Sequence, residues 1–525
     1  MKPFDSRGAF VAAADRHGLL SLAVRGAGAT LLSNALGLAT QIVAVVILAR
    51  LLTPADFGIV TMVTTFSLLL VNFGGNGFNE AVLQRQEIDR YLASNLFWIS
   101  IGTGLFFTIG FAAMGSLLVR FYHNQQVGHI AVALSSTIFL SSTSVLHLAL
   151  LRRAMRFSAL SVLDIVARAC SVAVSIFLAR AGWGYWALVA GTVVQPLTTS
   201  IGACTLCQWT PSLPRRVVGT GSMLRFAINV YGRFTVNYFT RNLDNVLVGW
   251  HFNAVSLGFY KKAYDLFALS AGALIAPLTS VAVSALSRLD RTSVQYRRSL
   301  LNALAVTTVV GMGLGGALTL TGKDVIRLLL GPGWEPAGRI FTFFGPGVGA
   351  MLLYYTNGWI HLSIGRADRW FRWGVVEFAV TGLLFIAALP WGPVGVAAAW
   401  TASFWILTIP AFWYAGRPIR FGVGPVIAAA WRYVLASLVA GCASAFIIGR
   451  IPALVAGSGS VGASHRIVMN SVLFGTLYLG AVILLHRGCA PIYQVARLLR
   501  QMAPLGMFYR PSPAVAATEV TTPST

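Results

Sequence analysis

MLRFAINVYGRFTVNYFTRNLDNVLVGW, residues 223–250, is an apolar stretch of membrane length that carries charged residues inside it. Its polar residues recur at spacings of four, four and three: Arg233, Asn237, Arg241 and Asp244. This spacing places them along one stripe of a helix. A charge at bilayer depth costs about 2.5–3.5 kcal/mol on insertion scales, so such residues face a protein-lined or watery interior. Two arginines on one spanning helix predict a path for an anionic substrate.

The rest of the 525-residue chain also has the composition of a membrane protein. Hydrophobic residues make up 56% and charged residues only 10% of it, whereas soluble domains have about 25% charged residues. Mean hydropathy is +0.73. Apolar stretches of about 20 residues are long enough to cross a bilayer. We expect an all-α integral membrane protein with about fourteen spans, near 23–49, 57–79, 93–118, 128–150, 160–180, 184–207, 223–250, 263–287, 300–320, 338–364, 371–390, 393–415, 427–449 and 467–486.

The segments before the first span and after the last one are more polar than the spans. Residues 1–22 contain charges and lack an apolar core before a cleavage site, so we expect no cleavable signal peptide and a first span that is itself the insertion signal. The polar residues after Pro511 predict a disordered end.

The net charge of +24 indicates membrane topology and not nucleic-acid binding. If the N-terminus is cytoplasmic, the basic residues concentrate in the cytoplasmic connections, as the positive-inside rule requires. This bias predicts an even number of spans with both termini in the cytoplasm. The clusters are Arg152/Arg153/Arg156, Arg215/Arg216, Arg288/Arg291/Arg297/Arg298, Arg366/Arg369/Arg372 and Arg417/Arg420.

No motif in the chain predicts an enzyme, a metal site or a cofactor. Cys204 and Cys207 have metal-like spacing but lack a second pair, so we interpret them as small packing residues. The glycines at 311–316 resemble a dinucleotide loop but lie inside a span with no strand before it, and helix packing explains them better.

The chain repeats itself at an offset of 200 residues. RLLTPADFGIV (50–60) aligns with WHFNAVSLGFY (250–260), so that Gly58 falls on Gly258. GWGYWALVAG (182–191) and WGPVGVAAAW (391–400) are a second, weaker match. Six spans separate the copies, and an even number gives both copies the same orientation, as in transporters whose two lobes surround a substrate path. Because hydrophobic helix hairpins resemble one another, each match alone also fits unrelated spans.

The repeat predicts two pseudo-symmetric six-helix lobes followed by two additional helices. The expected parts are a cytoplasmic segment at 1–22, an N-lobe at 23–210, a C-lobe at 223–415, two helices at 427–486 and a cytoplasmic tail at 487–525.

Other polar residues within the spans have both a structural and a functional interpretation. Asp164 and Arg168, four residues apart, predict a local ion pair or a contribution to a cationic lumen. Arg25 lies near the cytoplasmic end of span one, where it either extends to the interface or contacts a ligand. Asn34 and Gln41 share one face of the same span.

Three acids are candidates for ion coupling or charge balance. Asp265 opens span eight and is expected to pair with Lys261 or Lys262. Glu377 lies one or two turns into span eleven, and Asp244 belongs to the opening stripe. Asn357 and His361 are four apart in span ten, and a lone histidine there is more often structural than a proton carrier.

Four segments resemble bacterial polysaccharide exporters, the Wzx-type flippases of the multidrug/oligosaccharidyl-lipid/polysaccharide exporter superfamily. They are AVLQRQEIDRYLASNLFWIS (81–100), LLRRAMRFSALSVLD (150–164), GWGYWALVAG (182–191) and NLDNVLVGWHFNAVSLGFYKKAYDL (242–266). The resemblance covers roughly residues 20–450. It implies two six-helix lobes around a central cavity, and transfer of an undecaprenyl-diphosphate-linked oligosaccharide across the bacterial inner membrane for exopolysaccharide or lipopolysaccharide biosynthesis. Membrane lipids and the polymerase and chain-length proteins of such a pathway are the implied partners.

The resemblance also implies cationic cavity residues that meet the anionic substrate. Arg25, Arg233 and Arg241 match this role, with Asp244 as a modulating acid. Span one contributes Asn34 and Gln41 but no arginine at mid-span, so the implied anion path is weighted toward the C-lobe. Arginine suits a diphosphate because its forked donors match phosphate oxygens.

Three other functions remain open from the sequence. A multidrug exporter on the same fold would need acids and aromatic residues in its cavity, whereas the embedded charge here is mainly basic. A lipid II flippase differs only in its substrate. A membrane glycan polymerase or ligase would need a large outer loop with catalytic groups, and the connections here are short.

Overall fold

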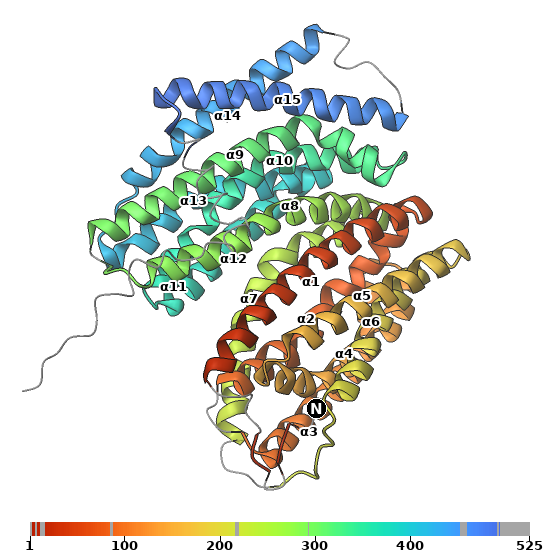
Figure 1. The fold of residues 1–525 in the computed structure, drawn as a ribbon. Helices are drawn as coiled ribbons and strands as arrows, with labels where there is room; N and C mark the ends of the chain where they lie inside the picture. The colour runs from red at the N-terminus through yellow and green to blue at the C-terminus, as the bar shows by residue number, and fades with distance from the viewer. Residues whose placement is uncertain are drawn as a thin grey trace, which may run out of the picture.

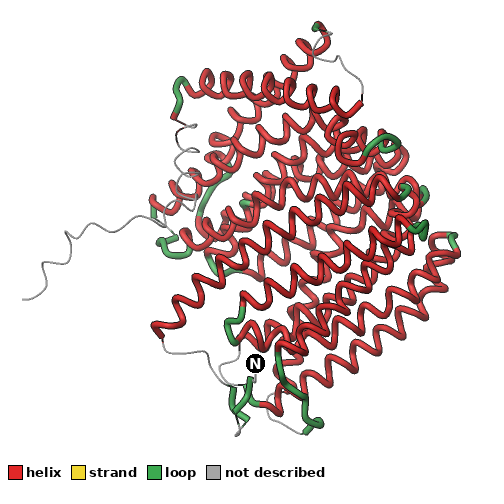
Figure 2. The backbone as a smooth tube through the Cα atoms, turned by 45° about the vertical axis from the view of Figure 1, so that its right-hand side comes forward, coloured by secondary structure: helices red, strands yellow, loops and turns green. Residues whose placement is uncertain are grey.

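The computed structural model is almost entirely helical, and it describes residues 3–5, 8–10, 16–84, 88–215, 220–291, 293–451, 459–490 and 493. Figure 2 shows long helices joined by short loops, and no described segment forms a strand beyond isolated bridges. The side chains of Arg25 and Arg233, and the tail after Pro511, lie outside the described residues.

The N-lobe contains the first six helices, which pack on one another. They are α1 (Arg16–Leu51), α2 (Pro54–Gln84), α3 (Arg90–Tyr122), α4 (Gln125–Arg153), α5 (Phe157–Arg180) and α6 (Tyr185–Leu206). The pairs that pack most extensively are α3 with α4, α2 with α4, α5 with α6, α1 with α5, and α4 with α6.

The C-lobe repeats this arrangement. Its helices are α7 (Thr220–His251), α8 (Ala254–Leu286), α9 (Val294–Leu330), α10 (Glu335–Tyr355), α11 (Asn357–Ser363), α12 (Ala367–Ala388) and α13 (Gly392–Gly416). The corresponding pairs pack here too: α9 with α10, α8 with α10, α12 with α13, α7 with α12, and α10 with α13. The predicted pseudo-symmetric lobes are therefore confirmed.

Two further helices, α14 (Gly424–Arg450) and α15 (Gly459–His486), pack on α9. They lie on the side of the C-lobe away from the N-lobe (Figure 1). The glycines of α9 allow this close packing: a Cβ atom on Gly316 would overlap the Phe474 ring, and one on Gly315 would meet the Gly345 carbonyl oxygen of α10 at 2.9 Å. The interpretation of this glycine run as a helix-packing surface is confirmed.

The described residues form fourteen long helices, which agrees with the predicted number of spans. Ten segments among the described residues are by themselves long and apolar enough to cross a membrane, one of them running over both α12 and α13. The helices α7, α8 and α10 are not among these ten. Charged residues inside these helices, such as Asp244 of α7 and Lys262 of α8, are buried within the protein, so they need not face lipid.

Two predicted boundaries were wrong. The expected span 263–287 begins earlier, at Ala254, because its charged residues pair with one another and the helix continues through them. Asp265 therefore lies well inside α8 and does not open it. The expected span 338–364 is interrupted at Thr356, where the backbone tightens and the Thr356 hydroxyl donates to the Leu353 carbonyl oxygen at 2.6 Å.

The sequence repeat reappears at the contact between the lobes. Asn253 caps α8 by accepting from Ser256 N at 2.8 Å, and Thr53, 200 residues earlier, precedes α2 and is bonded to Asp56. A Cβ atom on Gly58 would overlap the Ala254 carbonyl oxygen, and one on Gly258 would overlap the Pro54 carbonyl oxygen. The two glycines thus make reciprocal backbone contacts where α2 and α8 cross.

The symmetry is broken elsewhere between the lobes. The helix α2 packs along α7, where Tyr231 and Tyr238 donate hydrogen bonds to carbonyl oxygens of Leu69 and Thr65 at 3.0 and 2.7 Å. The symmetry-related pair, α1 and α8, lacks this extensive packing among the described residues. The lobes therefore contact each other along α2 and α7, and the described residues show no equally extensive contact between α1 and α8.

Candidate functional site

A cavity of about 300 Å³ lies in the C-lobe between α7, α10, α11 and α12. Arg241 and Asn237 reach it from α7, one helical turn apart, as the predicted stripe requires. Glu377 reaches it from α12, and Asn357 from the start of α11. The structure thus brings together two predicted substrate residues and one predicted coupling acid, although Glu377 is distant from α7 in the sequence.

Arg241 is held inside this cavity by aromatic residues. Its guanidinium carbon lies 5.0 Å from the centre of the Tyr355 ring, a cation–π contact. Glu377 is close enough to attract it electrostatically, although these two described side chains form no contact ion pair. The Tyr354 hydroxyl is close to Glu377 and accepts a hydrogen bond from Trp373 Nε1 at 2.8 Å. The guanidinium is therefore placed by α10 and α12 and not by α7 alone.

Asp244 does not line the cavity and points into the core of the C-lobe. It is fully buried, and its Oδ2 accepts hydrogen bonds from the Tyr260 hydroxyl and Trp400 Nε1, both at 2.8 Å. These donors come from α8 and α13. Asp244 therefore does not join Arg241 at the cavity: three residues along a helix turn the side chain by about 60°, and its donors lie on that side.

The remaining predicted acids are in ion pairs. Asp265 contacts Lys261 at 2.7 Å and Lys262 at 3.6 Å, so the expected pairing is confirmed with both lysines. Lys262 is nearly buried and lies over the Phe57 ring of α2, 4.1 Å from its centre. The pair therefore belongs to the contact between the lobes.

The polar residues of the N-lobe lie apart from this cavity. Arg168 pairs with Asp164 at 3.0 Å, which confirms the local ion pair, and it lies beside Gly37 of α1. Asn34 and Gln41 are exposed on α1. The predictions for Arg25 and Arg233 fall outside the described side chains.

Sequence reasoning missed the aromatic lining, which comes from Phe234, Tyr354, Tyr355, Trp370 and Phe371. Aromatic residues are common near the ends of all membrane helices, so they give no specific signal in one sequence.

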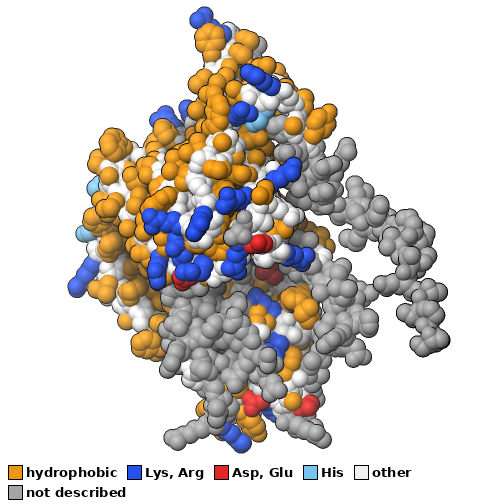
Figure 3. All heavy atoms as spheres, turned by 90° about the vertical axis from the view of Figure 1, so that its left-hand side faces the viewer, with side chains coloured by type: hydrophobic (Ala, Val, Ile, Leu, Met, Phe, Trp, Pro, Cys, Tyr) orange, Lys and Arg blue, Asp and Glu red, His pale blue; other side chains and the backbone are white. Residues whose placement is uncertain are grey.

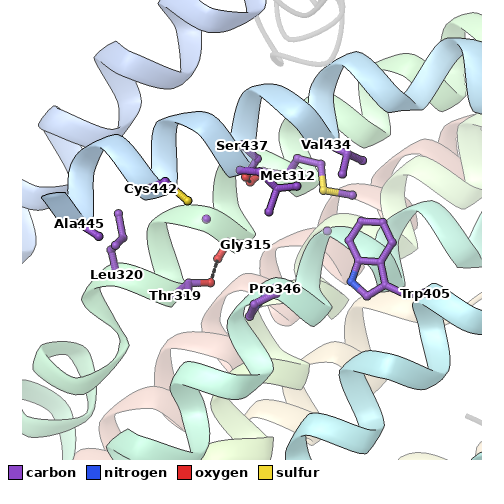
Figure 4. A pocket seen from close by; sticks show the side chains of 14 residues that line it. Met312, Gly315, Thr319, Leu320, Pro346, Trp405, Val434, Ser437, Cys442 and Ala445 are labelled. Atoms are coloured by element: carbon purple, nitrogen blue, oxygen red, sulfur yellow. Dashed lines mark hydrogen bonds between the residues drawn. The ribbon is translucent and has the colours of Figure 1, made fainter.

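A second cavity, of about 320 Å³, is apolar. Figure 4 shows it between α9, α10, α13 and α14, with Met312, Pro346, Trp405 and Cys442 around it. Its hydroxyl groups are bonded to helix carbonyls, since Thr319 donates to Gly315 at 2.7 Å and Ser437 to Met312 at 3.0 Å. No charged side chain lines it among the described residues. It therefore suits apolar groups and does not suit a charged head group.

Solved structures share this arrangement of helices. The lipid II flippase MurJ in an inward closed conformation matches with a TM-score of 0.69 and 15% identity, over 88% of this chain and 99% of that one. An inward-facing multidrug resistance MATE family transporter of the MOP superfamily matches with a TM-score of 0.60 and 13% identity, over 73% and 94%. The chain has the two-lobed membrane fold found in these proteins.

Sequence comparisons then define the family. The succinoglycan biosynthesis transport protein ExoT of Rhizobium meliloti is 21% identical over 70% of this chain and 74% of its own length. The teichuronic acid biosynthesis protein TuaB of Bacillus subtilis is 24% identical over 64% of this chain and 69% of its own length. The lipopolysaccharide biosynthesis protein WzxC of Escherichia coli is 20% identical over 74% of this chain and 79% of its own length. The family model described as "Polysaccharide biosynthesis protein" matches residues 47–339, more than half of the chain. The chain belongs to this polysaccharide biosynthesis protein family.

Proposed function

We propose that this protein is a flippase that moves a lipid-diphosphate-linked oligosaccharide across the bacterial inner membrane for exopolysaccharide or lipopolysaccharide biosynthesis. It is a transporter and not an enzyme. Family membership and the transport activity named for the Rhizobium relative support this function. The observation in the structure that carries it is a guanidinium, Arg241, held in a cavity within the membrane-embedded helices.

The chemistry of the substrate requires such a cavity. A diphosphate with a polar glycan does not cross hydrocarbon unaided, because each buried charge costs several kcal/mol. Polar groups of the C-lobe replace the water around the substrate's head group, and the lipid tail remains in the bilayer. Arg241 and Asn237 contact the head group, and Arg25, Arg233, Asn34 and Gln41 complete its path. Separation of the lobes at the α2–α8 contact and their approach at the opposite end expose the cavity to each side of the membrane in turn.

The positions of the exposed basic residues indicate which end of the helices faces the cytoplasm in our proposal. Exposed arginines gather where α8 ends and where α9 and α12 begin, including Arg288, Arg291 and Arg298. Figure 3 shows this face, with Lys and Arg side chains in a band across it. In our proposal this face is cytoplasmic, both termini are cytoplasmic, and the Gly58–Gly258 contact lies at the outer end. The lobes are then closed toward the outside.

A cysteine-labelling map tests this orientation. In a variant without native cysteines, we expect Gln125→Cys to react with a membrane-impermeant thiol reagent in spheroplasts. Arg291→Cys should react only after permeabilisation, because it lies at the opposite end of the helices. The reverse labelling pattern would contradict the proposed topology.

Truncation of the cavity arginine tests the function. We expect Arg241→Ala to lower polysaccharide secretion by about 10- to 100-fold, because hydrogen bonds to charged groups contribute about 1.5–3 kcal/mol. Arg241→Lys should recover only part of it, since lysine lacks the forked donors. Secretion is measured in a producing strain that lacks its own copy, at matched protein level.

The control is Arg417→Ala, whose exposed guanidinium lies over Trp413 outside the cavity. It should leave secretion unchanged. Normal secretion by Arg241→Ala at normal protein level would disprove the role of this arginine in transport.

The pathway supplies the further partners in this proposal. A polymerase and chain-length proteins accept the translocated unit, and membrane lipids surround the apolar faces. Nucleic acid is not a partner, because the basic residues cluster at one end of the helices. Coupling to an ion gradient, if the protein uses one, involves the acids of the C-lobe, of which Glu377 alone among Asp244, Asp265 and Glu377 lines the cavity.

A further inference from the structure

Among the described side chains that line it, the cavity of the C-lobe carries one positive and one negative group. Arg241 is its guanidinium and Glu377 its carboxylate, and the two attract each other across it. A diphosphate brings at least two negative charges, which a site with this balance does not neutralise. The cavity therefore suits an uncharged polar group better than the diphosphate itself.

The walls of the cavity are aromatic to an unusual degree for a polar site. Five of its lining residues are aromatic, and Trp370 is 40% exposed there, beside Gly358 of α11. Tyrosine and tryptophan present a flat apolar face together with a polar edge. A sugar ring has the complementary surface, with apolar C–H faces and hydroxyl groups around its rim.

The floor of the cavity holds an unsatisfied acceptor. Asn357 is 2% exposed and lines the cavity, and its Nδ2 donates to the Tyr354 carbonyl oxygen. Its Oδ1 has no hydrogen-bond partner among the described residues. Buried polar groups are nearly always paired, so this orphaned acceptor in a cavity-lining residue is available to a ligand hydroxyl once the Asn357 side chain turns toward the cavity.

We infer that this cavity is a sugar-binding subsite that takes an uncharged sugar ring of the glycan. The Trp370 ring stacks on one face of the sugar, and Asn357 accepts a hydrogen bond from a hydroxyl. Arg241 donates to, and Glu377 accepts from, hydroxyls on the rim. This inference rests on the proposed flippase function and assigns the sugar, not the diphosphate, to this part of the path.

Binding of matched lipids tests the inference. The full-length protein in nanodiscs is titrated with undecaprenyl diphosphate and with the same lipid bearing one glucose, galactose, mannose or N-acetylglucosamine. We expect at least one sugar-bearing lipid to bind about tenfold more tightly than the sugar-free lipid. This is the gain in affinity that one or two well-placed hydrogen bonds provide. Trp370→Leu and Asn357→Ala should each abolish this preference and leave binding of the sugar-free lipid unchanged.

Trp405→Leu is the matched control. Trp405 has an exposed fraction similar to that of Trp370, 37% against 40%. It lines the apolar cavity between α9, α10, α13 and α14. Its replacement should leave the sugar preference intact. Because Trp370 is partly exposed, its variant tests the inference even if Asn357→Ala does not fold.

The outcomes separate the two proposals. Equal affinity of the wild type for sugar-free and all sugar-bearing lipids would overturn the subsite while leaving the flippase function standing. A preference that survives in Trp370→Leu would also overturn it. A wild-type protein that binds none of these lipids would contradict the proposed function itself.

Discussion

Replacing Gly58 and Gly258 together with alanine is expected to abolish transport. Each glycine lies where α2 and α8 cross, and a Cβ atom on either would overlap a backbone carbonyl oxygen of the other helix, that of Ala254 or of Pro54. Backbone atoms cannot rotate away as a flexible side chain can, so the helices must separate at this end. Overpacking costs about 1–3 kcal/mol at each site.

The separation would weaken other contacts that hold the lobes together here. Trp334 Nε1 donates to the Ala49 carbonyl oxygen at 3.0 Å, and Arg50 Nη2 donates to that of Leu328 at 3.0 Å. Both depend on the close approach of the lobes. A protein that cannot reach this closed state cannot alternate between two states, and we expect secretion to fall to the level of a strain without the protein.

The measurement is secretion at matched protein level, together with thiol labelling of Ser256→Cys beside the crossing. We expect labelling to become faster in the double alanine variant because the crossing opens. Gly272→Ala is the control, since it lies on the same helix with open space around it. Wild-type secretion and labelling in the double variant would show that the crossing is not a required contact.

The second large effect is expected from Asp244→Ala, which should destabilise the whole C-lobe. This change leaves the Tyr260 hydroxyl and Trp400 Nε1 buried without their acceptor. Each unsatisfied buried donor costs about 1–3 kcal/mol, and the removed carboxyl group leaves a void as well. We expect a lower free energy of unfolding and a lower yield of folded protein.

Thermal unfolding of the purified protein, followed by tryptophan fluorescence in detergent, measures this effect. Asp244→Asn retains an acceptor of the same shape and should lose less stability than Asp244→Ala. Asp164→Ala is the control, because the half-exposed pair of Asp164 with Arg168 contributes about 0–1 kcal/mol. An unfolding temperature for Asp244→Ala equal to that of the control would refute the structural role of this carboxylate.

Much of the architecture could be predicted because membrane folding leaves strong local signals. Long apolar runs must be helices, since only there are all backbone groups paired within the segment. The alignment of Gly58 with Gly258 predicted two lobes, and the structure places both glycines where α2 and α8 cross. Ion pairs between residues three or four apart, such as Lys261 with Asp265, follow from helix geometry alone.

The site could be predicted only in part, because most of the residues around Arg241, Asn237 and Glu377 are neutral aromatic residues that are far apart in the sequence. Arg241 and Asn237 stood out as polar residues in a span. Tyr355 and Trp370 did not, since aromatic side chains are ordinary in membrane helices. The stripe also grouped Asp244 with Arg241, whereas packing directs one to the core and the other to the cavity.

By itself, the sequence determined a fourteen-helix membrane protein of two repeated lobes with an arginine on the opening helix of the second. The tertiary structure alone decided what surrounds that arginine: the ring of Tyr355 and the carboxylate of Glu377, brought by α10 and α12. The physical reason is that hydrophobicity and helix periodicity act locally along the chain. The charge balance of a cavity depends on which helices pack around it.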